Sequence, residues 1–152
     1  RPYQAAMKET WDEFVRTAKN GHFLFLRDYM EYHADRFPDA SLLFYDDGNR
    51  LVGLLPATMR DGNLSSHAGL SFGGVISGRN MKVELMLELF AAMCAWLRGR
   101  GIREIVYKPD AGSADRSCAR ISAKAPPICL LSSTPLRCMD ASSMASCAGL
   151  MK

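Results

Sequence analysis

The sequence predicts a mixed α/β domain in which an antiparallel meander is followed by a strand–helix–strand crossover. Two Asp-Gly turn signals, within 46–49 and 60–63, separate apolar runs of strand length, as in a meander. Residues 81–98 then repeat apolar side chains at helical spacing, and a short apolar run follows at 102–108. Strand, helix and strand in this order form a right-handed crossover whose flanking strands are parallel.

Two helices are expected before the meander. In 10–19, Thr10 and Glu13 form a capping-box pattern ahead of an apolar stripe. A second helix is expected over 27–36, which carries apolar residues at helical spacing and stops before Pro38. The predicted order is therefore helix, helix, meander, helix, strand.

The meander is expected to contain three strands, over 41–45, 51–59 and 64–72. The third strand leads into the glycine-rich stretch 73–78, which joins it to the helix over 81–98. Because free backbone amides and the positive end of a helix meet at such a junction, it is a candidate anion site.

The composition of the chain limits the classes of protein to which it can belong. The 152 residues are 48% hydrophobic, which is enough for one domain with a real core and excludes a collagen-like or wholly disordered chain. The net charge is only +3, from 19 basic and 16 acidic side chains, and gives no sign of a nucleic-acid or anionic-membrane partner. The longest apolar run, 89–97, is far too short for a membrane span, and charges within 8–13 interrupt any signal-peptide core. We therefore expect a cytoplasmic protein.

The chain changes character at residue 109. Every aromatic residue lies within 1–108, whereas 109–152 has none and is rich in Ser, Ala, Pro and Cys. We therefore expect a folded domain over 1–108 and an atypical tail over 109–152. Either a shifted reading frame or a divergent or disordered natural extension explains the tail, and the sequence leaves both open.

The tail holds four of the five cysteines of the chain, Cys118, Cys129, Cys138 and Cys147. Their separations of 11, 9 and 9 positions do not match the C-x-x-C spacing of zinc sites, and no histidine lies beyond His67. Neither a metal site nor a disulfide is therefore expected.

A set of motifs within 2–108 gives the chain a family resemblance. They are Trp11-Asp12-Glu13-Phe14, Phe23-Leu24-Phe25-Leu26-Arg27-Asp28-Tyr29-Met30, Arg36-Phe37-Pro38-Asp39, Leu54-Leu55-Pro56-Ala57, Ser66-His67, Phe72-Gly73-Gly74 and Tyr107-Lys108-Pro109. Together they resemble the front part of the GNAT N-acyltransferase fold, in particular its FemAB-like branch, which includes bacterial GNAT acetyltransferases of envelope or polysaccharide synthesis. Relatives continue after the Tyr-Lys-Pro with an aromatic, acidic stretch that this chain lacks, so the back part of the fold is missing or altered.

The resemblance implies an N-acyltransferase that passes an acetyl or aminoacyl group to an amine. The implied donor is an acyl-CoA such as acetyl-CoA, or an aminoacyl-tRNA, and the implied acceptor is a cell-envelope or polysaccharide precursor. Such an enzyme needs backbone donors for a pyrophosphate and for the developing oxyanion, together with a route for the amine proton.

Three glycines, Gly73, Gly74 and Gly78, are candidate donor-binding residues because they lie where a strand gives way to the strongest helix. Arg79 and Lys82 follow them and are candidate phosphate partners. The stretch lacks the R/Q-x-x-G-x-G/A signature of coenzyme A binders, so a plain turn is the competing interpretation.

The candidate catalytic and substrate-binding residues lie at the start of the third predicted strand and at the end of the last one. Ser65, Ser66 and His67 could line the acceptor cleft, with His67 as base or hydrogen-bond partner. No acidic residue stands beside His67, so a structural histidine is the competing interpretation. Tyr107 and Lys108 end the last strand, where open α/β sheets place ligands, and Tyr107 is either catalytic or a core residue.

A second class of function competes with the enzyme. If the back of the fold is lost, one sheet edge and the apolar side of the helix over 81–98 become exposed. The chain would then be a non-catalytic truncated domain or a partner-binding fragment, and the open edge would favour a homodimer. Light scattering discriminates the two hypotheses, because the truncated domain is expected to self-associate.

Overall fold

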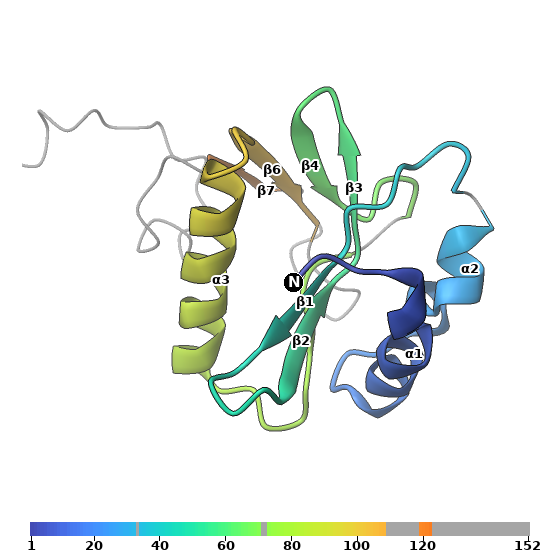
Figure 1. Cartoon of the computed structure of the whole chain (residues 1–152), viewed down its shortest axis with the longest axis vertical. Coiled ribbons are helices and arrows are strands. Elements are labelled where there is room, and N and C mark those ends of the chain that lie inside the picture. Colours follow the sequence, from blue (N-terminus) through green and yellow to red (C-terminus); the bar gives the residue numbers. More distant parts are fainter. Residues whose placement is uncertain (33, 71–72, 109–118, 123–152) are drawn as a thin grey trace, which may run out of the picture.

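The fold is a mixed α/β arrangement, as the sequence predicts, with helices on both sides of the strands (Figure 1). The structure is a computed structural model, and it describes residues 1–32, 34–70, 73–108 and 119–122, the last range by its backbone alone. In Figure 1, α3 stands on one side of the strands, and α1 and α2 stand on the other.

The described strands fall into two sheets. One holds three antiparallel strands in the order β1-β2-β5, namely β1 (Leu42–Tyr45), β2 (Leu51–Leu55) and β5 (Ile76–Ser77). The other has the order β3-β4-β6-β7 and holds β3 (Ala57–Arg60), β4 (Asn63–Ser66), β6 (Glu104–Tyr107) and β7 (Ala119–Ser122). β4 and β6 pair in parallel across the intervening helix, which confirms the parallel pair that the crossover predicts.

The second predicted strand, 51–59, is divided between the two sheets at Pro56. Proline has no backbone N–H, so it cannot continue a ladder of hydrogen bonds. β2 ends at Leu55 and pairs with β1 and β5, whereas β3 begins at Ala57 and pairs with β4. The meander is therefore present as two antiparallel pairs that belong to different sheets.

The third predicted strand, 64–72, is also shorter than expected. β4 ends at Ser66 because His67 has a φ of 54°, a left-handed conformation that an extended strand cannot continue. The chain turns here and returns as β5, which pairs with Gly53 and Leu54 of β2. The glycine-rich stretch thus contains a short strand that the sequence pattern does not predict.

Helix α1 (Lys8–Thr17) begins two residues before the predicted start at residue 10. A 3₁₀ turn, Ala5–Met7, leads into it, and Met7 at the N-cap position makes no side-chain capping bond. The predicted capping box of Thr10 and Glu13 is therefore wrong, because both residues lie inside the helix.

Helix α2 (Arg27–Glu31) is shorter than the predicted 27–36. Asp12 Oδ1 accepts the backbone N–H of Arg27 at 2.8 Å and so caps the start of the helix. Beyond the helix the chain turns back, and Asp39 Oδ2 pairs with the Arg27 guanidinium at 2.9 Å. This return contact takes the place of the last helical turns that the sequence pattern predicts.

Alternate residues of the central strands bury their side chains on opposite faces and so build two cores. One core lies against α3 (Val83–Arg98) and includes Leu42, Leu55, Val75, Leu89, Met93 and Leu97. The other lies against α1 and includes Leu43, Leu54, Ile76, Trp11, Val15 and Phe25. Each fully buried leucine contributes about 1.5–3 kcal/mol, so burial holds a helix layer on each face.

β6 does not have the open edge that the loss of the back of the fold would create. It lies between β4 and β7, and β7 pairs with it antiparallel from Glu104 opposite Ser122 to Tyr107 opposite Ala119. A four-residue strand from within 109–152 therefore covers this edge.

Several sequence predictions fall on residues outside the described ranges. Cys118, Cys129, Cys138 and Cys147 are among them, as is most of 109–152, whereas Cys94 is a buried free thiol on α3. Of the helices in the described ranges, none combines the length and the apolar character needed to cross a bilayer.

Candidate functional site

The carboxyl ends of the parallel strands β4 and β6 meet beside the glycine-rich stretch. Ser66, the last residue of β4, accepts a hydrogen bond on Oγ from the Lys108 backbone amide at 2.8 Å. The Lys108 ammonium donates to the Leu70 carbonyl at 2.7 Å. Two predicted substrate-binding residues are therefore neighbours at the edge where α/β sheets commonly hold ligands.

Gly73 and Gly74 fit closely against these strand ends. Gly74 has a φ of 84°, and a Cβ there would lie 2.8 Å from the Tyr107 hydroxyl and 2.8 Å from the Lys108 carbonyl oxygen. A Cβ on Gly73 would lie 2.7 Å from the Ser66 carbonyl oxygen. Because no side chain fits at either position, the two glycines allow the chain to pass directly over the ends of β4 and β6.

The Tyr107 side chain crosses from β6 to the start of β5. Its hydroxyl accepts a hydrogen bond from the backbone amide of Val75 at 3.1 Å. The ring also lies edge-on to Phe90 of α3, with 5.6 Å between the centroids. The Tyr107 ring thus packs with the core, and its hydroxyl reaches the glycine-rich stretch.

His67 is buried at the end of β4, with 8% of its surface exposed. Its backbone N–H donates to the Pro56 carbonyl at 3.0 Å, which attaches it to the point where the strand 51–59 divides. The ring lies 5.8 Å from that of Phe25, and neither ring nitrogen has a hydrogen-bond partner among the described residues. Burial, with repulsion from Lys108 and Arg27, lowers the pKa of His67 from 6.5 to about 4, so the imidazole is neutral at pH 7.

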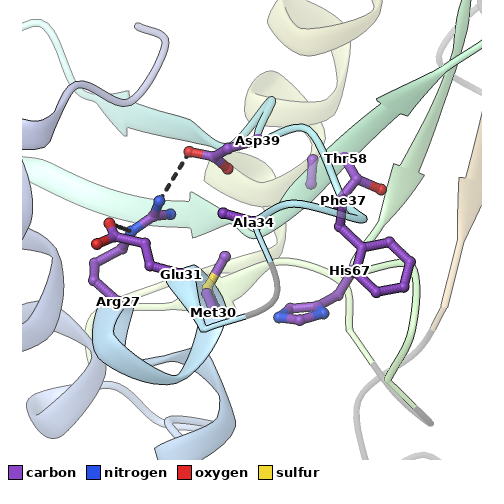
Figure 2. A pocket seen from close by; sticks show the side chains of 9 residues that line it. Arg27, Met30, Glu31, Ala34, Phe37, Asp39, Thr58 and His67 are labelled. Atoms are coloured by element: carbon purple, nitrogen blue, oxygen red, sulfur yellow. Dashed lines mark hydrogen bonds and ion pairs between the residues drawn. The ribbon is translucent and has the colours of Figure 1, made fainter.

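A small cavity of about 30 Å³ lies between His67 and helix α2 (Figure 2). It is lined by polar and apolar side chains from α2, from the turn that follows and from β3, namely Arg27, Met30, Glu31, Ala34, Phe37, Asp39, Ala57 and Thr58. His67, Arg27 and Ala57 are buried, whereas Glu31, Ala34 and Asp39 are exposed. The cavity therefore has a buried floor with His67 in it and an exposed mouth with two carboxylates.

Each of the three guanidinium nitrogens of Arg27 contacts a polar side chain at the wall of this cavity. Nε pairs with Glu31 at 3.1 Å, Nη2 pairs with Asp39 at 2.9 Å, and Nη1 donates to the Ser41 hydroxyl at 3.5 Å. The guanidinium also stacks over the Tyr3 ring, with 3.6 Å from Cζ to the centroid. Figure 2 shows both ion pairs on the side of the cavity away from His67.

The remaining predicted site residues do not lie with those at the carboxyl ends of β4 and β6. Ser65 precedes Ser66 on β4 and therefore faces the opposite side of the sheet. Gly78 and Arg79 lie in the connection between β5 and α3, where the Gly78 amide donates to Val52 and Arg79 Nε donates to the Thr17 carbonyl. Lys82 is the N-cap residue of α3 and is exposed.

The sequence pattern does not single out the cavity residues of α2 and the following turn. Arg27 and Asp39 belong to the motifs that carry the family resemblance, but nothing in their spacing shows that they form an ion pair. One usable signal is Arg27, which directly follows the apolar residues 23–26, because a buried arginine needs partners. Over the described ranges, no cluster of three or more His, Cys, Asp or Glu is suited to hold a metal ion.

Comparison with known structures establishes the fold. The structure is similar to the ribosomal-protein-S18-alanine N-acetyltransferase from Escherichia coli, with a TM-score of 0.51 and 9% sequence identity over 75% of this chain and 68% of that chain. A GNAT family acetyltransferase from Brucella melitensis in complex with acetyl-CoA aligns with a TM-score of 0.47 and 15% identity over 83% of this chain and 87% of that chain. No family model matches the chain, and no curated protein matches it in sequence.

A likeness at such low identity concerns the fold and not the reaction. The chain therefore has a GNAT-like fold, which confirms the fold expected from its motifs.

Proposed function

We propose that this protein is an N-acyltransferase, which moves an acyl group from an activated thioester to an amine. The observation that carries the proposal is the pair of side chains on either side of Gly73 and Gly74. His67 lies buried on one side, with ring nitrogens that have no hydrogen-bond partner in the described ranges, and the Tyr107 hydroxyl meets the Val75 amide on the other. A GNAT-like fold with these two groups at the ends of β4 and β6 is suited to acyl transfer.

The reaction forms a C–N bond and breaks a C–S bond. The amine attacks the thioester carbonyl, negative charge develops on the carbonyl oxygen, and the leaving thiolate takes up a proton. A neutral imidazole can accept an N–H of the attacking amine, so His67 orients the nucleophile, and the amine loses its surplus proton to solvent. The Tyr107 hydroxyl, which carries a proton of its own, is the donor to the leaving sulfur.

For His67 the structure favours the hydrogen-bonding role over that of a base. A base is most effective when its pKa lies near the working pH. The pKa of His67 is lowered to about 4, so the imidazole binds a proton weakly at pH 7. It remains a good hydrogen-bond acceptor, which is what holding a neutral amine requires.

The donor in this proposal is an acyl-CoA, with acetyl-CoA as the first choice. The sixteen-residue helix α3 presents its positive end and the exposed Lys82 beside the connection that carries Gly78. An anionic donor group is therefore favoured there. Arg79 already donates to the Thr17 carbonyl, so Lys82 is the better candidate for a phosphate.

The FemAB-like motifs suggest a cell-envelope or polysaccharide precursor as the acceptor. They also keep aminoacyl-tRNA as the alternative donor. In either case the group acylated is an amine, and the same two residues, His67 and Tyr107, serve the transfer.

Thiol release tests the proposal directly. Full-length protein is mixed with acetyl-CoA and a panel of primary amines, including amino sugars, and free thiol is followed over time. We expect amine-dependent release that Tyr107→Phe reduces at least tenfold. Tyr32→Phe is the matched control, because Tyr32 is 80% exposed and outside the site, and it should leave the rate unchanged.

Two further measurements complete the test. Calorimetry with acetyl-CoA reports donor binding without turnover, and charged tRNA replaces acetyl-CoA in a parallel transfer assay. If the full-length protein neither binds acetyl-CoA nor transfers from either donor, the proposal is contradicted.

A further inference from the structure

His67 stands out among the buried polar side chains because both of its ring nitrogens lack a well-formed hydrogen bond to the described residues. With 8% of its surface exposed, it lies on the floor of the cavity under α2, and Figure 2 shows its ring at that cavity. Neither Nδ1 nor Nε2 has a partner among the described residues. A buried polar group without a partner lowers stability by about 1–3 kcal/mol. A ligand that forms a hydrogen bond to a ring nitrogen of His67 would recover this cost.

The charged groups around the cavity decide what kind of ligand fits. Arg27 is the cation on the wall, and its nitrogens are already occupied by Glu31, Asp39 and Ser41. Glu31 and Asp39 together place two negative charges in the lining against the one positive charge of Arg27, while Lys108 adds a positive charge outside the lining. An anion would find the guanidinium donors already taken and would be repelled by the two carboxylates, whereas a group rich in N–H donors meets acceptors.

Glu31 supplies a second acceptor at the mouth of the cavity. Its Oε1 takes the bonds from Arg27 at 3.1 Å and from the Tyr3 hydroxyl at 3.3 Å. Within the described part of the chain, Oε2 receives no hydrogen bond, and the side chain is 45% exposed. An N–H group entering from solvent therefore meets a carboxylate first and a neutral imidazole further in.

We propose that this cavity receives the amino head group of the acceptor, with His67 accepting a hydrogen bond at the floor and Glu31 attracting the group at the mouth. The ligand class is an unhindered primary amine. This proposal rests on the proposed acyl transfer and names the part of the acceptor that the site selects.

The size of the cavity sets the selectivity. A volume of about 30 Å³ exceeds the roughly 10–15 Å³ that one water molecule needs, and it holds only a small group. An amino group has one heavy atom and fits, whereas methyl groups on the nitrogen would collide with Met30, Phe37 or Ala57 in the lining. A primary amine should therefore bind, and its fully methylated counterpart should not.

Binding can be measured without any reaction. In isotopically labelled full-length protein, the ring resonances of His67 are assigned by their loss in His67→Phe. Methylammonium chloride, tetramethylammonium chloride and sodium acetate are then titrated separately. We expect methylammonium alone to shift the His67 resonances in a saturable way. An unshifted ring with methylammonium, or an equal shift with acetate, would overturn the proposal.

Kinetic variants separate a binding role from a structural one. His67→Phe keeps an aromatic ring beside Phe25 but has no nitrogen, and we expect at least a tenfold rise in KM for the amine with an unchanged KM for acetyl-CoA. His67→Asn keeps an acceptor and tolerates the φ of 54°, so its rise in amine KM should be smaller. A rise in both KM values together would indicate general disruption and contradict the specific role.

A carboxylate pair gives the matched control. Glu31→Gln should raise the KM for the amine, whereas Glu13→Gln removes an exposed partner of Arg16 on α1 and should leave it unchanged. If the two variants behave alike, Glu31 does not attract the acceptor.

The two proposals fail in different ways. His67 shifts with methylammonium but no thiol release from any donor would contradict the acyl transfer and leave the amine site standing. Thiol release with no His67 shift would contradict the amine site and leave the acyl transfer standing.

Discussion

Val75 and Tyr107 are 32 positions apart in the chain, yet the backbone amide of the first donates to the hydroxyl of the second at 3.1 Å. This bond connects the sheet that ends at β5 with the sheet that contains β6. Val75 is 4% exposed, so water cannot easily replace the hydroxyl as the acceptor. The contact is therefore both a structural bond between the sheets and the point where the proposed proton donor is held.

Tyr107→Phe should lower the free energy of unfolding by about 1–2 kcal/mol, because it leaves the Val75 amide buried without an acceptor. Urea unfolding followed by fluorescence measures the change. Tyr32→Phe, at an exposed position, should shift the midpoint by much less. Equal effects of the two substitutions would mean that the Val75–Tyr107 bond does not contribute to stability.

Gly74→Ala should destabilise the protein more than Gly62→Ala. Both glycines have a left-handed backbone, with φ of 84° and 75°, so the conformational cost of about 1–2 kcal/mol is common to both. Only at Gly74 does the new Cβ meet atoms at 2.8 Å, whereas nothing lies within 4 Å of it at Gly62. We expect an additional loss of about 1–3 kcal/mol at Gly74, measured by urea unfolding, and similar losses would contradict the close fit.

The buried His67 should make stability fall as the pH is lowered from 6.5 towards 4. The unfolded chain binds a proton near pH 6.5, and the folded protein resists it until about pH 4, so the unfolded state holds more protons in this window. The difference amounts to at most about 3 kcal/mol. Lys108 and Arg27 face the ring and act in the same direction as burial.

Urea unfolding of wild-type protein and His67→Phe at pH 7 and pH 4.5 tests this dependence. The wild-type protein should lose stability relative to the variant as the pH falls, since phenylalanine has no group to protonate. Parallel losses in the two proteins would show that His67 is not protonated on unfolding.

Disrupting β7 should make the protein self-associate. Ile121 lies opposite Ile105 in the antiparallel pair of β7 and β6. Proline at this position removes a backbone donor and cannot continue the pairing, so Ile121→Pro should expose the edge of β6. Light scattering should detect dimers or larger species of Ile121→Pro. Ile121→Val keeps the backbone amide, so its oligomeric state should be that of the wild-type protein. A monomeric Ile121→Pro protein would show that β7 is not needed to cover the edge.

The long elements could be predicted from the sequence because their patterns are local. The helix over 81–98 agrees closely with Val83–Arg98, and the two Asp-Gly turns lie where β1 gives way to β2 and β3 to β4. The division at Pro56 was readable in principle, since proline interrupts a strand. The two-residue strand β5 could not be predicted, because an alternation of apolar and polar side chains cannot be recognised over Ile76 and Ser77 alone.

The candidate site was predictable only in part, because local sequence patterns do not show which distant segments come into contact. Tyr107 and Lys108 were expected at the end of the last strand, whereas Ser66 and His67 were expected at the start of the strand over 64–72. Because β4 ends at Ser66, its parallel pairing with β6 brings these two sets of residues together. The cavity depends on contacts between segments far apart in sequence, such as Arg27 with Asp39. No periodicity in a single sequence contains that information.

The two cores on opposite faces of the central strands have an evolutionary consequence. Leu54 and Leu55 are adjacent in the chain but belong to different cores, and Met30, which lines the cavity, packs with the core that contains Leu54. Substitutions that share no contacts change stability almost independently. Residues of α2 and the following turn can therefore diverge around the cavity, and with them the amine that is accepted, while the core under α3, which meets the cavity at Ala57, is inherited intact. One scaffold can in this way give rise to descendants with different acceptors.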